Sequence, residues 1–235
     1  CESCLAMDGP QSIWKANDIY DAYPNYHQCK SPGPMSNRYV KFVNQVARIV
    51  AKEFPDKYIS FFAYGSTAAP PLDPNWTLES NVVVEYANCV HCYSHAFDDP
   101  ACQANASFAK WLGGWASRAK VTYYDYPPMG PNWKVPTVLT HSLKRHLASL
   151  KKTGVIGLAG ENQGDWGGSA LYHYLEARLL WDIDTDVDKL VKEFCRDMYG
   201  PAAPAMESFY NTFEQKLPEF SVSGQTGQLS GHVAY

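Results

Sequence analysis

Short apolar runs alternate along the chain with longer segments in which apolar positions recur at helical spacing. Runs rich in Val, Ile, Phe and Tyr predict strands, and the helical period predicts helices. The expected strands are 58–64, 81–86, 120–126 and 155–159, and the expected helices are 36–54, 105–119, 137–152, 170–181, 184–199 and 201–217. The 155–159 strand is apolar throughout, which predicts burial on both faces of its sheet. Ser36 and the pair Thr185-x-x-Asp188 are the expected N-terminal caps of two of the helices.

A helical segment precedes each expected strand except the second, and this alternation predicts a parallel sheet with right-handed crossovers. Four β/α units are half of an eight-stranded barrel, and an entire barrel takes about 250 residues. No Gly-x-Gly-x-x-Gly or phosphate-loop motif follows an expected strand, which disfavours a nucleotide-binding sheet. We therefore expect an α/β fold over residues 1–217, the C-terminal half of a (β/α)8 TIM-type barrel with additional C-terminal helices.

Half a barrel leaves an open sheet edge, so the N-terminal half is expected elsewhere on the parent chain. Residues 218–235 are rich in Ser and Gly and are expected to be a linker or ragged end.

Composition narrows the class of partner. The net charge of −4 lacks the basic excess that nucleic acid or an anionic membrane attracts. No apolar run approaches the roughly 20 residues of a membrane helix. The chain contains 16 Tyr, 7 Trp and 10 Phe. Aromatic rings stack on the apolar faces of sugars but fill cores by default, and that default weakens for Trp76, Trp133 and Trp166, which lie in expected loops.

The compartment is predicted from cysteines and glycosylation sequons. Seven Cys residues, two pairs of them at C-x-x-C spacing, are typical of disulfides in an oxidising compartment. Asn75-Trp-Thr77 and Asn105-Ala-Ser107 are both acceptor triplets for N-linked glycans. The chain starts at Cys1 without a Met, as a processed or truncated product would. We expect a secreted or extracellular protein, with lumenal and periplasmic locations as alternatives.

Cysteine and histidine gather in the loop after the second strand, as Cys89-x-His91-Cys92-x-x-His95. Zinc uses such ligands, but this spacing matches no common structural zinc motif. A disulfide, with Cys102 as a nearby partner, is the favoured interpretation, and no metal or other cofactor is expected. Elsewhere, Cys195 is expected to be a buried small hydrophobe, and His141 and His146 a solvated helix face.

The catalytic hypothesis rests on polar residues at strand ends. Glycoside hydrolysis needs two carboxyl groups, about 5–5.5 Å apart for retention and about 6.5–9.5 Å apart for inversion. Asp125 ends the third expected strand, and Glu161 follows the fourth at the start of a Gly-rich loop. They are the expected catalytic pair, without an assignment of acid and base. The alternative is that Asp125 caps a turn and that Glu161 pairs with a cation.

Other residues are expected to shape a sugar subsite: Tyr64, Glu85, His95, Tyr126 and Trp166. Glu85 lies inside an apolar strand, where a carboxylate faces either the site or an arginine. Tyr64 offers a phenol to a sugar hydroxyl, or is simply an aromatic at the barrel rim.

A series of motifs matches one known family in order along residues 1–217. The matching residues are Cys1-x-x-Cys4, Asn37-Arg38, Phe42-Val-Asn44, Ala63-Tyr64, Asn81-Val-Val-Val, Cys92-Tyr93-x-His95, Trp115, Tyr124-Asp125-Tyr126, Gly154-Val-x-Gly157, Glu161, Tyr174-Leu175 to Trp181-Asp182, Glu193-Phe194 and Tyr199-Gly200-Pro201-Ala202-Ala203. In these motifs the chain resembles an uncharacterised family of secreted, mostly bacterial barrel proteins related to α-glucuronidases and hexosaminidases.

The resemblance implies a glycoside-hydrolase-like barrel and favours a sugar-contacting role for His95. In that family an Asn-Asp strand end lies upstream of the first C-x-x-C, and this sequence lacks it. One candidate catalytic residue of the family therefore has no counterpart here.

Two hypotheses follow, and they differ in class. The first is an extracellular glycoside hydrolase acting on a polysaccharide or glycoconjugate, with Asp125 and Glu161 as catalytic carboxylates. The second is a non-catalytic glycan-binding or structural barrel in a surface or extracellular assembly. A metal-dependent hydrolase built on the Cys/His loop is a weaker third.

Overall fold

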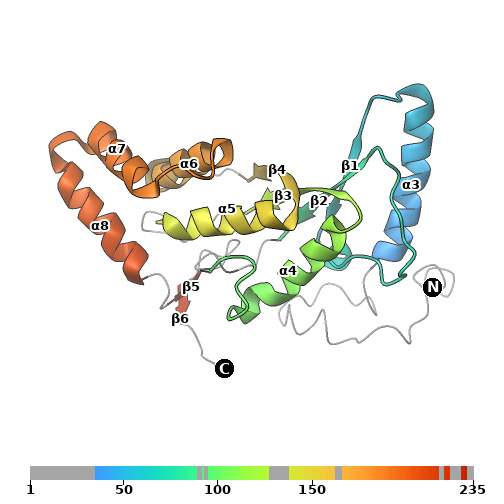
Figure 1. Ribbon diagram of the computed structural model, residues 1–235, viewed down its shortest axis with the longest axis horizontal. Helices are drawn as coiled ribbons and strands as arrows, with labels where there is room; N and C mark the ends of the chain where they lie inside the picture. Colours follow the sequence, from blue (N-terminus) through green and yellow to red (C-terminus); the bar gives the residue numbers. More distant parts are fainter. Residues whose placement is uncertain are drawn as a thin grey trace. The chain divides into compact units, whose positions relative to one another are not determined.

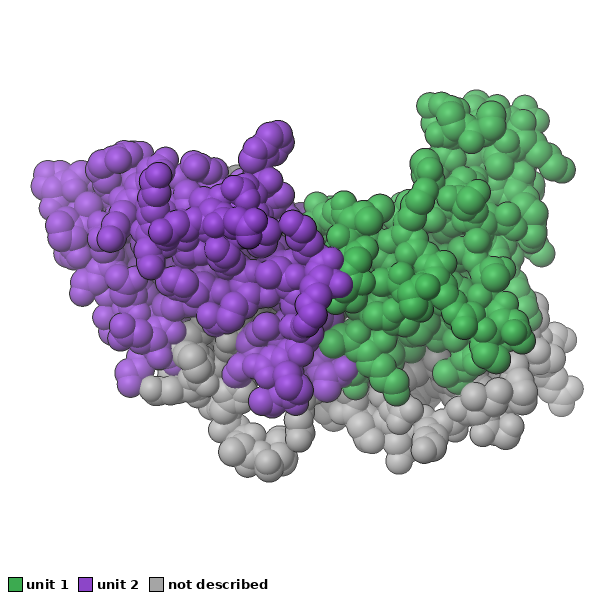
Figure 2. All heavy atoms as spheres, viewed as in Figure 1, with its two compact units in different colours: residues 1–88, 107–125, 153–159 green, residues 89–106, 126–152, 160–235 purple. Residues whose placement is uncertain are grey.

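The computed structural model describes residues 35–88, 92, 95–126, 138–161, 166–216, 220–222 and 229–231. The chain divides into two compact units, which Figure 2 shows in different colours. Unit 1 contains Cys1–Asn88, Ser107–Asp125 and Thr153–Ala159, and unit 2 contains Cys89–Ala106, Tyr126–Lys152 and Gly160–Tyr235.

A four-stranded parallel sheet organises unit 1, and its strands alternate with helices as the sequence predicts. The strands lie in the order β1 (Ile59–Ala63), β2 (Val82–Ala87), β3 (Lys120–Asp125) and β4 (Val155–Gly160). The register pairs Ile59 with Val82 and Val83 with Lys120. A short 3-10 turn, η2 (Gly65–Thr67), follows β1, whereas helices precede β1, β3 and β4. The expected α/β class with a parallel sheet is therefore confirmed.

One face of this sheet is buried under helices α3 (Ser36–Glu53) and α4 (Gln103–Ala116). Phe61 packs edge-on against Tyr39 of α3 and Trp115 of α4, with ring centroids 5.3 and 5.8 Å apart. On the neighbouring strand, the Tyr86 hydroxyl donates to the carbonyl oxygen of Phe108 in α4, at 3.3 Å. Burial raises the pKa of this phenol well above its usual value, so it stays a neutral donor.

Ser36 does not cap α3, contrary to the sequence prediction. It is the first residue of the helix, and its hydroxyl donates to the carbonyl oxygens of Thr67, at 3.3 Å, and of Ala69. The side chain is buried and faces the loop after β1. Tertiary contact has therefore replaced the local cap and fixes that loop against the start of the helix.

The loop after η2 packs closely on α4. The Trp115 indole N–H donates to the carbonyl oxygen of Ala68, at 2.8 Å, and its ring meets Trp76 with centroids 5.1 Å apart. Trp76 is therefore a core residue, although its loop position weakens that expectation in the sequence. A Cβ built on Gly114 would lie 2.7 Å from Cγ of Pro70, so glycine is what allows this approach.

The prediction that the fourth strand is buried on both faces is wrong. Ile156 in β4 is 65% exposed, and the remaining residues of the strand are exposed or half-buried. β4 ends the strand order, so within the described part of the chain it has β3 alone as a neighbouring strand. An apolar run is compatible with burial on both faces, but the position of the strand in the sheet determines how much of its surface is buried.

Unit 2 is mainly helical. Its helices are α5 (His141–Thr153), α6 (Trp166–Trp181), α7 (Val187–Tyr199) and α8 (Ala203–Lys216), with the short η3 (Gly200–Ala202) between the last two (Figure 1). The Tyr199 and Tyr210 hydroxyls, on α7 and α8, lie 2.7 Å apart. Tyr174 of α6 and Phe194 of α7 have ring centroids 5.6 Å apart. None of the described helices is long and apolar enough to span a membrane.

Helix ends in unit 2 differ from the sequence predictions. Asp186, rather than Thr185, caps α7, and its carboxylate accepts from the Lys189 backbone N–H at 3.2 Å. The described part of α5 begins at His141, and residues 127–137 lie outside the described chain. Within the expected linker 218–235, two short antiparallel strands occur, β5 (Phe220–Val222) and β6 (Leu229–Gly231).

The two histidines expected on a solvated face behave differently. His146 is fully buried on α5, where its ring meets Phe97 edge-on with centroids 5.6 Å apart. That prediction is therefore wrong for His146. His141 is partly exposed, and its Nε2 lies 3.2 Å from a carboxylate oxygen of Asp188. Cys195 of α7 is fully buried, as predicted.

Candidate functional sites

The face of the β1–β4 sheet opposite α3 and α4 is open and carries aromatic and carboxylate side chains. Phe62 is 46% exposed, and Glu85, Thr122 and Tyr124 are half-buried. The register places Phe62, Glu85 and Thr122 side by side on three adjacent strands. The rings of Phe62 and Tyr124 meet edge-on across β2, with centroids 5.3 Å apart. We call these four residues the open-face group.

The open face has a glycine, Gly157, on β4, so no side chain projects from the sheet at that position. A Cβ built on Gly157 of β4 would stand 3.5 Å from the Cγ2 methyl of Thr122, which is ordinary van der Waals contact. Its place next to Thr122 puts Gly157 on the open face of β4. The absence of a side chain at Gly157 leaves the neighbouring Thr122 side chain uncovered from that side.

Glu85 belongs to this open face, and Asp125 does not. Along β3, the buried residues are Val121, Tyr123 and Asp125, so the carboxylate lies on the helix-covered face and is fully buried. Strand alternation in the sequence carries this signal, because Asp125 is two residues beyond Tyr123. Burial argues against direct contact of Asp125 with a sugar, whereas Glu85, which the sequence analysis expects in the sugar subsite, is half-buried and accessible.

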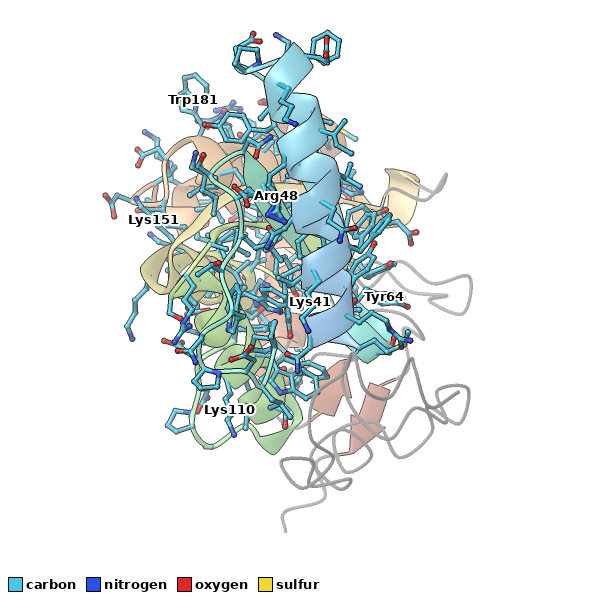
Figure 3. All side chains as sticks on the ribbon, turned by 90° about the vertical axis from the view of Figure 1, so that its right-hand side faces the viewer. Lys41, Arg48, Tyr64, Lys110, Lys151 and Trp181 are labelled. Carbon is cyan, nitrogen blue, oxygen red and sulfur yellow. The ribbon has the colours of Figure 1, made fainter. Side chains whose placement is uncertain are left out.

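The other predicted site residues at strand ends are found close to the ends of their strands. Glu161 follows β4 directly and is exposed. Tyr126 follows β3 and is half-buried. Tyr64 follows β1, is half-buried, and lies beside the first turns of α3 (Figure 3). Trp166 is the first residue of α6, and its side chain lies outside the described part of the chain.

In unit 2, His95 lies in a cluster with two cysteines. Its Nδ1 is 3.3 Å from the Cys92 sulfur, and one ligand atom from each of Cys92, His95 and Cys102 lies within 4.8 Å of the others. Both cysteines are buried and carry thiols, whereas the sequence favoured a disulfide in this loop. Cys89 and His91 lie outside the described residues. The structure therefore places His95 beside two cysteine sulfurs.

Asn105 holds this cluster in place and is not an accessible sequon. Its amide oxygen accepts from the Cys92 N–H at 2.7 Å, and its amide nitrogen donates to the carbonyl oxygens of Cys92 and Ala96, at 3.0 and 3.3 Å. The residue is fully buried, so a glycan on it is incompatible with this fold. Asn75 is exposed, which leaves its sequon accessible.

The fold and these groups define an α/β protein built on a parallel sheet with one open face. The chain belongs to the family described as "Domain of unknown function (DUF4838)", which matches residues 20–211. No curated protein and no solved structure matches the chain significantly. Since the family description carries no activity, a functional proposal rests on the residues of the chain itself.

Proposed function

We propose that the protein is carbohydrate-active, of glycoside-hydrolase type, and that a sugar binds on the open face of the β1–β4 sheet. The observation that carries the proposal is the open-face group. The rings of Phe62 and Tyr124, which are in edge-on contact, offer an apolar surface suited to a sugar ring. The half-buried Glu85 carboxylate beside them can accept hydrogen bonds from two hydroxyls, and Thr122 adds a hydroxyl of its own.

We also propose that the sheet is a part of a (β/α)8 barrel. The strands of such a barrel have helices outside and side chains of neighbouring strands inside. The buried Phe61 face under α3 and α4 matches the outside, and the open-face group would then point inward. In this arrangement the exposed edge of β4 is where further strands would continue the sheet.

Hydrolysis needs a protonated and an ionised carboxyl group on opposite sides of the scissile bond. Glu85 is the carboxylate that the open face offers, and Glu161 is exposed directly after β4. Asp125 is the weakest of the three because its side chain is fully buried on the other face. On the open face of unit 1 we therefore assign the catalytic carboxylate to Glu85 ahead of Asp125, and Glu161 of unit 2 is a separate candidate.

The burial of Asp125 also favours the second candidate, a glycan-binding or structural barrel that does not cleave its ligand. Both candidates need Phe62 and Tyr124 to bind the sugar. They differ in that only the hydrolase needs a carboxylate for cleavage. The accessible Asn75 sequon supports a secreted or extracellular location for either one.

The test is hydrolysis of aryl glycosides and uronic-acid oligosaccharides by the full parent protein, beside Glu85→Gln, Glu161→Gln and Asp125→Asn. Loss of about 100-fold or more in kcat for Glu85→Gln or Glu161→Gln, with folding intact, is the expected result. Glu79→Gln is the control, because Glu79 forms a largely exposed ion pair with Arg48 at 3.2 Å. Turnover that survives both variants would contradict the assignment of these carboxylates.

Binding is measured separately by retention on immobilised glycans. Phe62→Ala and Tyr124→Ala should each weaken binding, whereas Phe42→Ala on α3, where the ring is 58% exposed, should not. Absence of turnover on every substrate, together with aromatic-dependent retention, would favour the non-catalytic candidate. Retention unchanged in both aromatic variants would rule out the open face as the sugar site.

A further inference from the structure

We propose that Cys92, His95 and Cys102 bind a zinc ion, a site that is independent of the proposed carbohydrate function. The structure places two sulfurs and one imidazole nitrogen within 4.8 Å of one another. Two thiolates and one imidazole are a set that zinc uses in proteins, with a fourth position left for water or another ligand. The sequence motif alone did not select this set, because Cys102 is ten positions after Cys92.

The spacing of the ligand atoms suits a tetrahedral ion. With Zn–S near 2.3 Å and Zn–N near 2.0–2.1 Å, tetrahedral angles require a sulfur-to-nitrogen distance of about 3.6 Å and a sulfur-to-sulfur distance of about 3.8 Å. The Cys92 sulfur and His95 Nδ1 are 3.3 Å apart. The other two distances are no longer than 4.8 Å, so side-chain shifts of up to about 1 Å would complete the site.

Backbone hydrogen bonds hold the loop in the conformation that presents these ligands. Asn105, in the first turn of α4, binds both the N–H and the carbonyl of Cys92, at 2.7 and 3.0 Å. The Cys102 N–H donates to the carbonyl oxygen of Asp99 at 3.0 Å, and the Asn105 N–H donates to that of Cys102 at 3.1 Å. Asn105 is fully buried and forms hydrogen bonds with the Cys92 backbone. The loop and the start of α4 are therefore held together before any metal binds.

Charge balance also favours a divalent ion at this place. Cys92 and Cys102 are 1% and 2% exposed, so two isolated thiolates there would be costly. Binding of Zn²⁺ releases the two thiol protons to solvent, and the ion with two thiolates and a neutral imidazole has no net charge. The ion would join Cys92 and His95 of the loop to Cys102, immediately before α4, and so stabilise unit 2.

A disulfide between Cys92 and Cys102 is the alternative for the same two sulfurs, and it has a distinct signature. It removes two hydrogens, needs an oxidant, and gives His95 no metal to bind. The two states are mutually exclusive, so a single preparation analysed for both metal and thiols distinguishes them.

The experiment measures the zinc content of the full-length chain by elemental mass spectrometry. The protein is purified without chelator and without added metal. We expect about one zinc per chain in the wild type and less than about a tenth of that in Cys92→Ser, Cys102→Ser and His95→Gln. Cys195→Ser and His141→Gln are matched controls and should keep the metal, because neither residue belongs to a described ligand cluster.

A second measurement uses only the wild-type protein, so it does not depend on the variants folding. Wild-type protein stripped of metal by a chelator should take up about one Zn²⁺ per chain when the ion is titrated back. Substitution of Co²⁺ should give thiolate-to-metal charge-transfer absorption. Metal-free wild-type protein that fails to take up either ion, or a peptide with Cys92 disulfide-bonded to Cys102 in protein isolated without reductant, would overturn the proposal.

Discussion

Buried polar side chains join segments that are distant in the sequence. The Glu214 carboxylate of α8 accepts from the backbone N–H groups of Thr140 and Ser142, at 3.0 and 2.9 Å, and so caps the start of α5. Ser36 ties α3 to the loop after β1, and Asn105 ties α4 to the cysteine loop. In each case a side chain satisfies backbone groups that would otherwise be buried without partners, which is where single residues contribute most to stability.

Cys195 gives a prediction of pH dependence at the residue scale. Burial, and then the negative charge of Glu207, raise the pKa of its thiol to about 11 from an ordinary 9.0. The folded state therefore holds this proton more tightly than the unfolded state. The free energy of unfolding should be unaffected by this group below about pH 8.5 and should fall as the pH rises toward the folded pKa.

Urea unfolding at several pH values measures this effect, and Cys195→Ala is the comparison. The variant should show a shallower loss of stability between pH 9 and 11 than the wild type. The Tyr210 hydroxyl stays in both proteins; burial and Tyr199 are the larger causes that raise its pKa, and Cys195→Ala removes only the smallest one. Identical slopes in the two proteins would contradict the inferred shift.

At the scale of elements, α4 contains a pair of glycines that should respond in opposite ways to the same substitution. A Cβ on Gly114 would lie 2.7 Å from the Pro70 ring, whereas a Cβ on Gly113 would have nothing within 4 Å. Gly114→Ala should therefore lower the free energy of unfolding by about 1–3 kcal/mol, since the loop must move. Gly113→Ala should raise it by up to about 1 kcal/mol, because alanine favours the helix.

Chemical denaturation of both variants checks this prediction, with each glycine serving as the control for the other. Equal effects of the two substitutions would show that Pro70 does not lie against α4. The sequence marks the Gly113-Gly114 pair only as a weak point of the helix. The contact with Pro70 shows that one of the two is needed for packing.

At the scale of the whole molecule, each of the two units has its own buried residues, so local damage should stay within one unit. Gly114→Ala lies in unit 1, and Asp186→Ala removes the cap of α7 in unit 2, at a cost of about 1 kcal/mol. Hydrogen exchange should accelerate mainly in β1–β3 and α3 for the first variant, and mainly in α7 and α8 for the second. Acceleration spread evenly over both units would indicate one cooperative core instead of two.

The sequence by itself determined the order and type of the main elements from α3 to α8, but not β5 and β6, because strand and helix periods are local properties. Residues 58–64 and 120–126 contain β1 and β3, and the 184–199 segment contains α7. The burial of Cys195 followed equally from the small apolar character of a cysteine side chain. These features depend only on residues that are close together in the sequence.

Only the tertiary structure decided which face of each element is covered and which distant residues meet. Alternation assigns Glu85 and Asp125 to faces of their strands, but the packing of α3 and α4 determines which face is buried. The meeting of Cys102 with His95, and the burial of Asn105, likewise depend on how the loop folds back on α4. The burial of a side chain depends on which residues from distant parts of the chain pack against it. A local sequence pattern does not identify those residues.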